Sequence, residues 1–152
     1  MKEDFKSPVI TIAKGSTMKE ARELMKERRI RHLPVVGSDG GILGILSHRD
    51  MTDLEDLQNY PVELLASKPV IYVVNTTPLQ TVALKMIEEK ISSVLLTDEQ
   101  RNVTGIITTD DLLYQLALIL KDRPEESSRP WTGSDSLVTA GEFFRKLADI
   151  GI

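Results

Sequence analysis

An internal repeat limits what this chain can fold into more than any other feature. Residues 8–51 align with residues 69–112 without a gap, and nine of the 44 paired positions are identical. Most other apolar positions in the alignment are paired with apolar residues. Each repeat alone would be marginally stable, because a short chain buries only a modest share of its surface. We therefore expect two related units that share a core.

Hydrophobic periodicity and turn residues predict the same order of elements in both repeats: a strand, a helix, two strands joined by a hairpin, and a second helix. The predicted strands cover residues 9–13, 33–36, 42–46, 70–74, 93–97 and 103–107. The N-caps of the first helix of each repeat are predicted at Ser16 and at Thr77, which is followed by Pro78. The remaining helices are predicted over about 48–57, 62–66 and 109–121.

This order predicts an α+β fold of two pseudo-symmetric β-α-β-β-α repeats packed sheet to sheet, plus a C-terminal tail helix. The first repeat with its connector is assigned to residues 1–60, and the second repeat to residues 61–121. Residues 122–152 contain a polar, proline-containing linker followed by an amphipathic helix.

The composition excludes several classes of function. The chain has no cysteine, which excludes disulfides, thiolate nucleophiles and cysteine-based zinc sites. Its net charge of −4 argues against nucleic acid as the main partner. No apolar run approaches membrane-spanning length and no signal peptide is evident, so we expect a cytoplasmic protein without membrane contact. Ser47, His48 and Asp50 are too contiguous for a catalytic triad, and no metal-ligand cluster is present, so we expect neither an enzyme nor an obligatory cofactor.

Each repeat ends its last strand with the same motif: glycine, two aliphatic residues, a hydroxyl residue, two variable residues and aspartate. The motif covers Gly44–Asp50 and Gly105–Asp111. It predicts a strand-to-helix corner whose backbone N–H groups suit a polar ligand. A hydroxyl and a carboxylate three residues apart lie on one side of a helix start and can form hydrogen bonds with the vicinal hydroxyls of a ribose. The pattern is also an ordinary helix cap, but its recurrence in both repeats favours the ligand.

These motifs, together with Ser7–Ile12 and Ile30–Val36, resemble those of a tandem CBS-domain pair, often called a Bateman module. The resemblance covers about residues 2–120. It implies regulatory binding of an adenosine-containing ligand, such as AMP, ADP, ATP or S-adenosylmethionine, in clefts between the repeats. It also implies a homodimer, and an effect on a separate protein that the sequence does not identify.

The resemblance assigns ligand contacts to particular positions. The corner residues would hold the ribose: Ser47 with Asp50, and Thr108 with Asp111. The first-strand segments would border the adenine: Ile10, Thr11, Ile12, Ile71, Tyr72 and Val73. Residues around the start of the second strand would face the ligand or its phosphates: Arg31, His32, Pro34, Ser92, Ser93 and Leu95. Arg49 precedes the first aspartate where the second repeat has Asp110, so first-repeat residues are expected to meet most of the phosphate charge. The second site is expected to prefer a nucleoside, an uncharged-tail ligand or no ligand.

Other interpretations stay open. Tyr72 can be a core residue rather than a stacking partner for adenine. The apolar run of the last helix is interpreted as burial between the repeats and, in part, as a dimer face: Leu112, Leu113, Leu116, Ala117 and Leu120. The alternative function is a ligand-free dimeric interaction scaffold, in which the corners only cap helices and the tail helix recruits a partner. In that case Asp50→Ala and Asp111→Ala would leave stability unchanged in the presence of any ligand.

Overall fold

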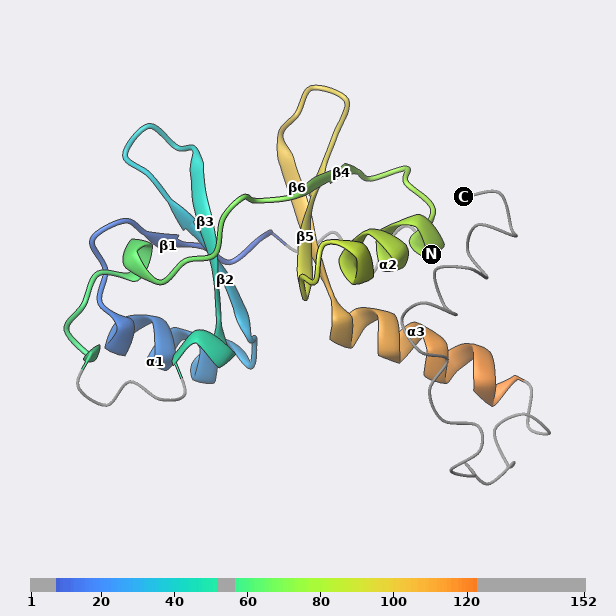
Figure 1. Ribbon diagram of the computed structural model, residues 1–152, viewed down its shortest axis with the longest axis horizontal. Helices are drawn as coiled ribbons and strands as arrows, with labels where there is room; N and C mark the ends of the chain where they lie inside the picture. Colours follow the sequence, from blue (N-terminus) through green and yellow to red (C-terminus); the bar gives the residue numbers. More distant parts are fainter. Residues whose placement is uncertain (1–7, 52–56, 123–152) are drawn as a thin grey trace. The chain divides into compact units, whose positions relative to one another are not determined.

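A computed structural model describes residues 8–51 and 57–122 (Figure 1). The chain divides into two compact units, residues 1–114 and residues 115–152. The strands of both repeats lie in the first unit. Each repeat forms a three-stranded sheet with its own helix. The predicted α+β class is therefore confirmed. The predicted tail helix lies outside the described residues.

The first repeat follows the predicted order of elements. Its elements are β1 (Ile12–Ala13), α1 (Met18–Arg28), β2 (His32–Val36), β3 (Ile42–Ser47) and a short 3-10 helix (His48–Met51). Strand β1 pairs in parallel with β2, and β2 pairs antiparallel with β3. A further 3-10 helix, Val62–Leu64, lies in the connection to the second repeat.

The second repeat reproduces this topology. Its elements are β4 (Tyr72–Val74), α2 (Leu79–Glu88), β5 (Ser93–Thr97), β6 (Val103–Thr108) and α3 (Thr109–Lys121). The sheet order β4-β5-β6 again combines one parallel and one antiparallel pair. The register of each hairpin shifts at the same place, between Val35 and Val36 in one and between Leu96 and Thr97 in the other. Equivalent residues of the two motifs therefore occupy equivalent positions.

Each repeat buries its own hydrophobic cluster, and Ile45 and Leu95 are buried outside both clusters. The first cluster joins α1 to β2 and β3 through Met25, Leu33 and Leu46, with Val62 from the connecting 3-10 helix. The second cluster joins α2 to β5 and β6 through residues such as Met86. Short amphipathic helices laid on one face of a small sheet suffice to enclose each cluster.

Several helix starts differ from the predictions. Helix α1 is capped by Thr17 and not by Ser16, because Glu20 stands three residues after Thr17 and completes a capping box. In that box the Thr17 N–H donates to Glu20 Oε2 at 2.7 Å, and the Glu20 N–H donates to Thr17 Oγ1 at 3.2 Å. The N-cap of α2 is Pro78, one residue after the predicted Thr77.

The helix predicted over 48–57 is a single 3-10 turn in its described part, His48–Met51, and residues 52–56 lie outside the described part of the chain. The prediction that the apolar run of α3 is buried is also mostly wrong. Helix α3 has no buried residue, and Leu113 and Leu116 are 62% and 49% exposed. Leu112 is half-buried and packs on the second cluster. No described helix has the length and apolar character needed to cross a membrane.

Candidate functional site

The duplicated motif builds the same corner in both repeats. The Thr108 N–H and Oγ1–H both donate to Asp111 Oδ2 at 2.7 Å, and the Ser47 N–H donates to Asp50 Oδ2 at 2.8 Å. The carboxylates thus cap their own corners, as the capping interpretation requires. In both corners the oxygen that accepts these bonds is Oδ2. Capping therefore orients each carboxylate within its corner.

Backbone pairing holds each corner beside the start of the second strand of its own repeat. The His48 N–H donates to the Arg31 carbonyl at 2.8 Å, and the equivalent Thr109 N–H donates to the Ser92 carbonyl at 3.0 Å. The corner residues themselves pair across the sheet, with Ser47 opposite His32. These contacts are made by backbone atoms, so they place the corner independently of the variable side chains.

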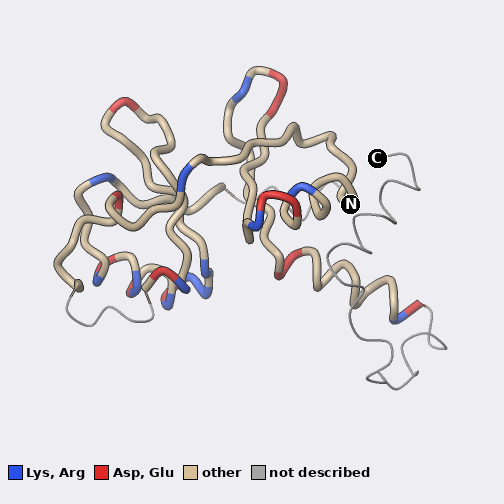
Figure 2. Tube along the Cα trace, viewed as in Figure 1, with Lys and Arg blue, Asp and Glu red and all other residues tan. Residues whose placement is uncertain are grey.

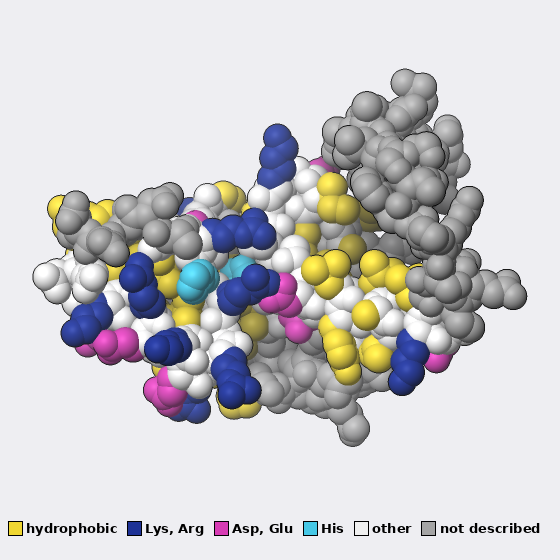
Figure 3. Space-filling view, turned by 90° about the horizontal axis from the view of Figure 1, so that it is seen from below, with side chains coloured by type: hydrophobic (Ala, Val, Ile, Leu, Met, Phe, Trp, Pro, Cys, Tyr) yellow, Lys and Arg dark blue, Asp and Glu magenta, His cyan; other side chains and the backbone are white. Residues whose placement is uncertain are grey.

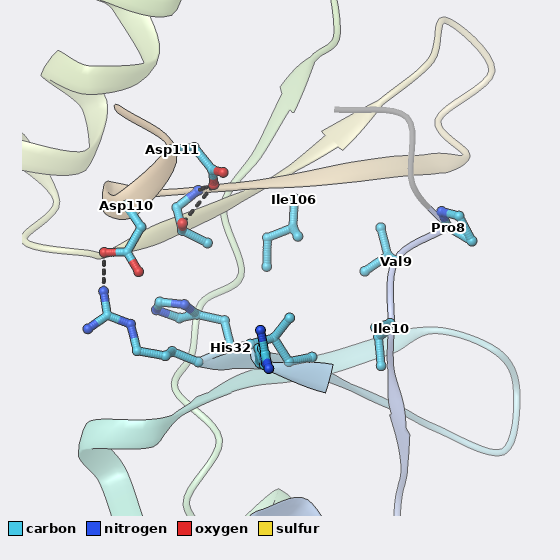
Figure 4. Close-up of a pocket in the computed structure, with 11 residues that line it drawn as sticks. Pro8, Val9, Ile10, His32, Ile106, Asp110 and Asp111 are labelled. Atoms are coloured by element: carbon cyan, nitrogen blue, oxygen red, sulfur yellow. Dashed lines mark hydrogen bonds and ion pairs between the residues drawn. The ribbon is translucent and has the colours of Figure 1, made fainter. Parts of the chain in front are cut away.

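The first of two candidate clefts, here called cleft A, has a volume of about 410 Å³, within the range of small-molecule sites. Figure 4 shows Asp110 and Asp111 at the start of α3, with Ile106 nearby and His32, Val9 and Ile10 contributed by the first repeat. The lining residues are Pro8, Val9, Ile10, Arg29, Ile30, Arg31, His32, Ile106, Thr108, Asp110 and Asp111. Cleft A therefore combines the first-strand segment of the first repeat with the corner of the second.

The second cleft, here called cleft B, has the reciprocal composition and a volume of about 220 Å³. Its lining residues are His32, Ile45, Ser47, Arg49, Asp50, Ser67, Pro69, Ile71, Lys90, Ile91, Ser92 and Ser93. It combines the corner of the first repeat with the first-strand segment of the second. The sequence placed clefts between the repeats, but the crossed pairing of corner and strand is a finding of the structure.

Two side-chain contacts join the repeats where the clefts meet. Arg31 forms an ion pair with Asp110, and both side chains are about half exposed. The His32 ring bonds through Nε2 with Ser92 Oγ at 2.8 Å. Burial, and then the charge of Arg31, lower the pKa of His32, so the ring is neutral at neutral pH. His32 is thus an uncharged wall that both clefts share.

The predicted site residues separate into four groups. Cleft A contains Ile10, Arg31, His32, Thr108 and Asp111, and cleft B contains His32, Ser47, Arg49, Asp50, Ile71, Ser92 and Ser93. A third, more open pocket between the two hairpins contains Thr11, Tyr72 and Val73. Ile12, Pro34 and Leu95 are buried and line none of these pockets. Tyr72 is 46% exposed, which argues against the core interpretation of this side chain.

Sequence reasoning missed several lining residues. Ile45 and Ile106 each lie two residues before the corner hydroxyl residue of their repeat. Ile106 lines cleft A and Ile45 lines cleft B. Arg29 and Lys90 are equivalent helix-end residues with φ of 54°, a left-handed conformation that ends each helix. Asp110, which replaces Arg49 of the first repeat, also lines cleft A. The sequence feature that could have identified each of these lining residues is its pairing with an equivalent residue 61 positions away in the other repeat.

The chain matches the CBS domain family over residues 2–56 and again over residues 62–118. These two matches cover most of the chain and coincide with the two structural repeats. The chain belongs to the CBS domain family.

Curated relatives carry this region as a small part of longer proteins. A homoserine O-acetyltransferase of Methanohalobium evestigatum is 31% identical over 104 residues, covering 68% of this chain and 21% of the relative. An L-aspartate semialdehyde sulfurtransferase of Methanocaldococcus jannaschii is 30% identical over 112 residues, covering 74% of this chain and 22% of the relative. The chain thus spans about a fifth of the length of these relatives.

A solved CBS-domain pair has the same fold. The CBS domain pair of protein MJ0100, solved in complex with 5′-methylthioadenosine and S-adenosyl-L-methionine, is 28% identical with a TM-score of 0.68. The alignment covers 76% of this chain and 94% of that chain. The predicted family and fold are confirmed.

Proposed function

We propose that the chain is a regulatory module that binds adenosine-containing small molecules in clefts A and B and acts on a separate protein. The observation that carries this proposal is the duplicated corner, because each Ser/Thr–Asp pair faces the first-strand segment of the opposite repeat across a cleft. A duplicated helix cap without a ligand would not require this crossed arrangement.

The chemistry of cleft A suits an adenosine. On this proposal Asp111 accepts hydrogen bonds from both ribose hydroxyls through Oδ1, while Oδ2 keeps its bonds from Thr108. Ile10 and Ile106 come from opposite repeats and offer apolar surface to a flat base. The structure of the related MJ0100 pair, which holds two adenosine-containing compounds, supports this class of ligand.

Regulation would follow from the crossed clefts. A ligand in either cleft touches both repeats at once, so it favours the arrangement of repeats in which those contacts are best. The cross-repeat contacts Arg31–Asp110 and His32–Ser92 lie on the same clefts and would respond to occupancy. On this proposal the adenosine compound is a regulatory ligand and not an obligatory cofactor, and the active species is a homodimer.

The test is thermal unfolding with 5′-methylthioadenosine, S-adenosylmethionine, AMP, ADP or ATP. A ligand at 100 times its dissociation constant adds about 2.7 kcal/mol of stability, which raises the melting temperature of a chain this size by roughly 5–10 °C. We expect Asp50→Ala or Asp111→Ala to remove the shift for the ligand held at that corner. Asp39→Ala is a matched control, because this carboxylate also accepts a local backbone N–H, from Gly41 at 3.1 Å, but lies on neither cleft. If none of these compounds shifts the wild-type transition, the proposal is wrong.

A second candidate function, the ligand-free scaffold, is favoured by the surface of α3. This helix carries charged residues only near its ends (Figure 2). Figure 3 shows hydrophobic side chains gathered beyond the acidic start of the helix. The exposed residues are Leu113, Tyr114, Leu116, Leu118 and Ile119. Retention of protein association in Asp50→Ala and Asp111→Ala, with no ligand response in the wild type, would favour this function.

A further inference from the structure

Each cleft is lined by a basic residue that ends a helix in the left-handed conformation, Arg29 in cleft A and Lys90 in cleft B. We propose that these two side chains bind the anionic tail of the ligand, so that the clefts select an adenosine compound with a phosphate over a neutral nucleoside. This inference rests on the proposed function, which it extends from a class of ligand to the residues that recognise the ligand's tail.

The backbone places the two residues identically in their repeats. Arg29 follows α1 with φ of 54°, and its N–H donates to the Lys26 carbonyl at 3.3 Å. Lys90 lies at the end of α2 with the same φ, and its N–H donates to the Ile87 carbonyl, also at 3.3 Å. Their side chains therefore start from equivalent points, although they line different clefts.

The residue type at these helix ends is not the one that the backbone prefers. Glycine adopts a left-handed conformation without strain, whereas a side chain with a Cβ is disfavoured there. The hairpins show how this position is usually filled, since the first repeat places Gly40 at φ of 82° where the second repeat has Arg101 at φ of 67°. At the helix ends both repeats instead carry a long basic side chain. A strained position with the same charge in both repeats points to a function of the side chain.

Arg29 is the charged residue of cleft A that lacks a partner. Of the four charged side chains in the lining, Arg31 and Asp110 form an ion pair, and Asp111 accepts two hydrogen bonds from Thr108. Arg29 is exposed, and its side chain forms no hydrogen bond or ion pair with another described residue. An anion that enters cleft A would therefore meet the Arg29 guanidinium without displacing a carboxylate from it.

Lys90 is in the same condition in cleft B. It is exposed, and among residues 8–51 and 57–122 its ammonium group has no hydrogen-bond or ion-pair partner. Guanidinium and ammonium groups are common protein partners of phosphate oxygens, and a guanidinium can bind two oxygens of one phosphate at once. Both clefts therefore offer a cation to the tail of a ligand whose ribose is held by the corner aspartate.

A different explanation of the two charges needs no ligand. A basic residue at a helix C-terminus interacts favourably with the negative end of the helix dipole. On that explanation, removal of the charge changes stability but does not change which ligand is preferred. The comparison of a charged with a neutral adenosine compound therefore separates the two explanations.

The test is isothermal titration calorimetry with AMP and with 5′-methylthioadenosine on the wild type and on the double variant Arg29→Asn/Lys90→Asn. Asparagine tolerates the left-handed conformation, so it removes the charge and keeps the helix end. We expect AMP affinity to fall about tenfold or more, the scale of one lost cation–phosphate contact. The affinity for 5′-methylthioadenosine should change by less than about threefold, because its tail is uncharged.

Single variants assign the effect to each cleft. Arg29→Asn should weaken AMP when added to Asp50→Ala, which leaves cleft A, and Lys90→Asn should do so when added to Asp111→Ala, which leaves cleft B. Arg29→Lys should restore most of the AMP affinity at low salt, and Arg29→Gly repeats the loss with the residue that the backbone prefers.

Arg101→Asn is the matched control, because Arg101 is also basic and left-handed but lines neither cleft, and we expect it to leave AMP affinity unchanged. Unchanged AMP affinity in the double variant, equal losses for both compounds, or a wild type that binds 5′-methylthioadenosine but not AMP would overturn this inference and leave the proposed function standing. A wild type that binds neither compound would overturn the proposed function, and this inference with it.

Discussion

The glycine that opens the first motif, Gly44, is required by a close backbone approach, and its replacement by alanine should be costly. A Cβ built on Gly44 would lie 2.8 Å from the Ala66 Cβ and 3.0 Å from the Ser67 carbonyl oxygen. The opposing segment is not free to withdraw, since the Ile45 N–H donates to the Ser67 carbonyl at 3.2 Å and the Ser67 N–H donates to the Ile45 carbonyl at 2.9 Å. Relief of the clash must therefore break or stretch one of these bonds.

The expected cost combines two effects. Overpacking a closely fitted site costs about 1–3 kcal/mol, and weakening one backbone hydrogen bond adds about 1 kcal/mol. We expect Gly44→Ala to lower the free energy of unfolding by about 2–4 kcal/mol. Because Ser67 and Ile45 line cleft B, the same substitution should weaken ligand binding there more than in cleft A.

The measurement is urea unfolding of the wild type, Gly44→Ala, Ala66→Gly and the double variant. Ala66→Gly removes the nearer of the two contacts and leaves the Ser67 carbonyl, so the double variant should recover part of the loss, with a coupling free energy of about 1 kcal/mol. Gly41→Ala is the control, because a Cβ there meets only the flexible Asp39 side chain, at 3.3 Å. A loss below about 0.5 kcal/mol for Gly44→Ala, or additive effects in the double variant, would refute the steric argument.

Two further predictions concern the first repeat. Thr17→Ala should destabilise the protein by about 1 kcal/mol in urea unfolding by removing the hydroxyl of the α1 capping box, whereas Ser16→Ala should have little effect. The second concerns His32, whose pKa burial and Arg31 lower from 6.5. Because the unfolded chain then binds the proton more readily, stability should be full above about pH 6.5 and fall as the pH drops below it. His32→Gln should flatten the dependence of the urea midpoint between about pH 5 and 8, and a dependence that persists in His32→Gln but disappears in His48→Gln would contradict the assignment.

The order of elements was predictable because the periodicities of helices and strands are local. Because the sequence pattern is duplicated, the same order of elements is predicted in each repeat. The predicted bounds of the strand Ser93–Thr97 agree with the structure at both ends. The errors arose where two local signals compete. Ser16 and Thr17 are both good caps, and the deciding residue is Glu20, whose spacing from Thr17 is visible in the sequence.

The candidate site was less accessible from the sequence, because its composition depends on contacts between distant segments. Strand alternation would place Ile10 and Ile12 on one face, and both contact the first cluster, but Ile10 precedes β1, is half-buried and also lines cleft A, whereas Ile12 is buried within the cluster. Pro34 is likewise buried within β2. The crossed pairing of corners and strands also has no local signal, since each corner is equally compatible with the strand of its own repeat.

The duplication explains why the clefts are both similar and able to differ. Backbone bonds such as His48 to Arg31 and Thr109 to Ser92 set the two corners, so they keep the shared geometry whatever side chains follow. The variable motif position is Arg49 in one repeat and Asp110 in the other. A substitution at this position changes the charge of the cleft lining without moving the backbone of the corner. Because the pairing is crossed, each such change acts on a cleft whose opposite wall belongs to the other repeat. Asp110 meets Arg31 across cleft A, and Arg49 shares cleft B with Ser92. The charge of each cleft is therefore a joint property of both repeats, and a substitution in one repeat is interpretable only together with the residue that faces it from the other.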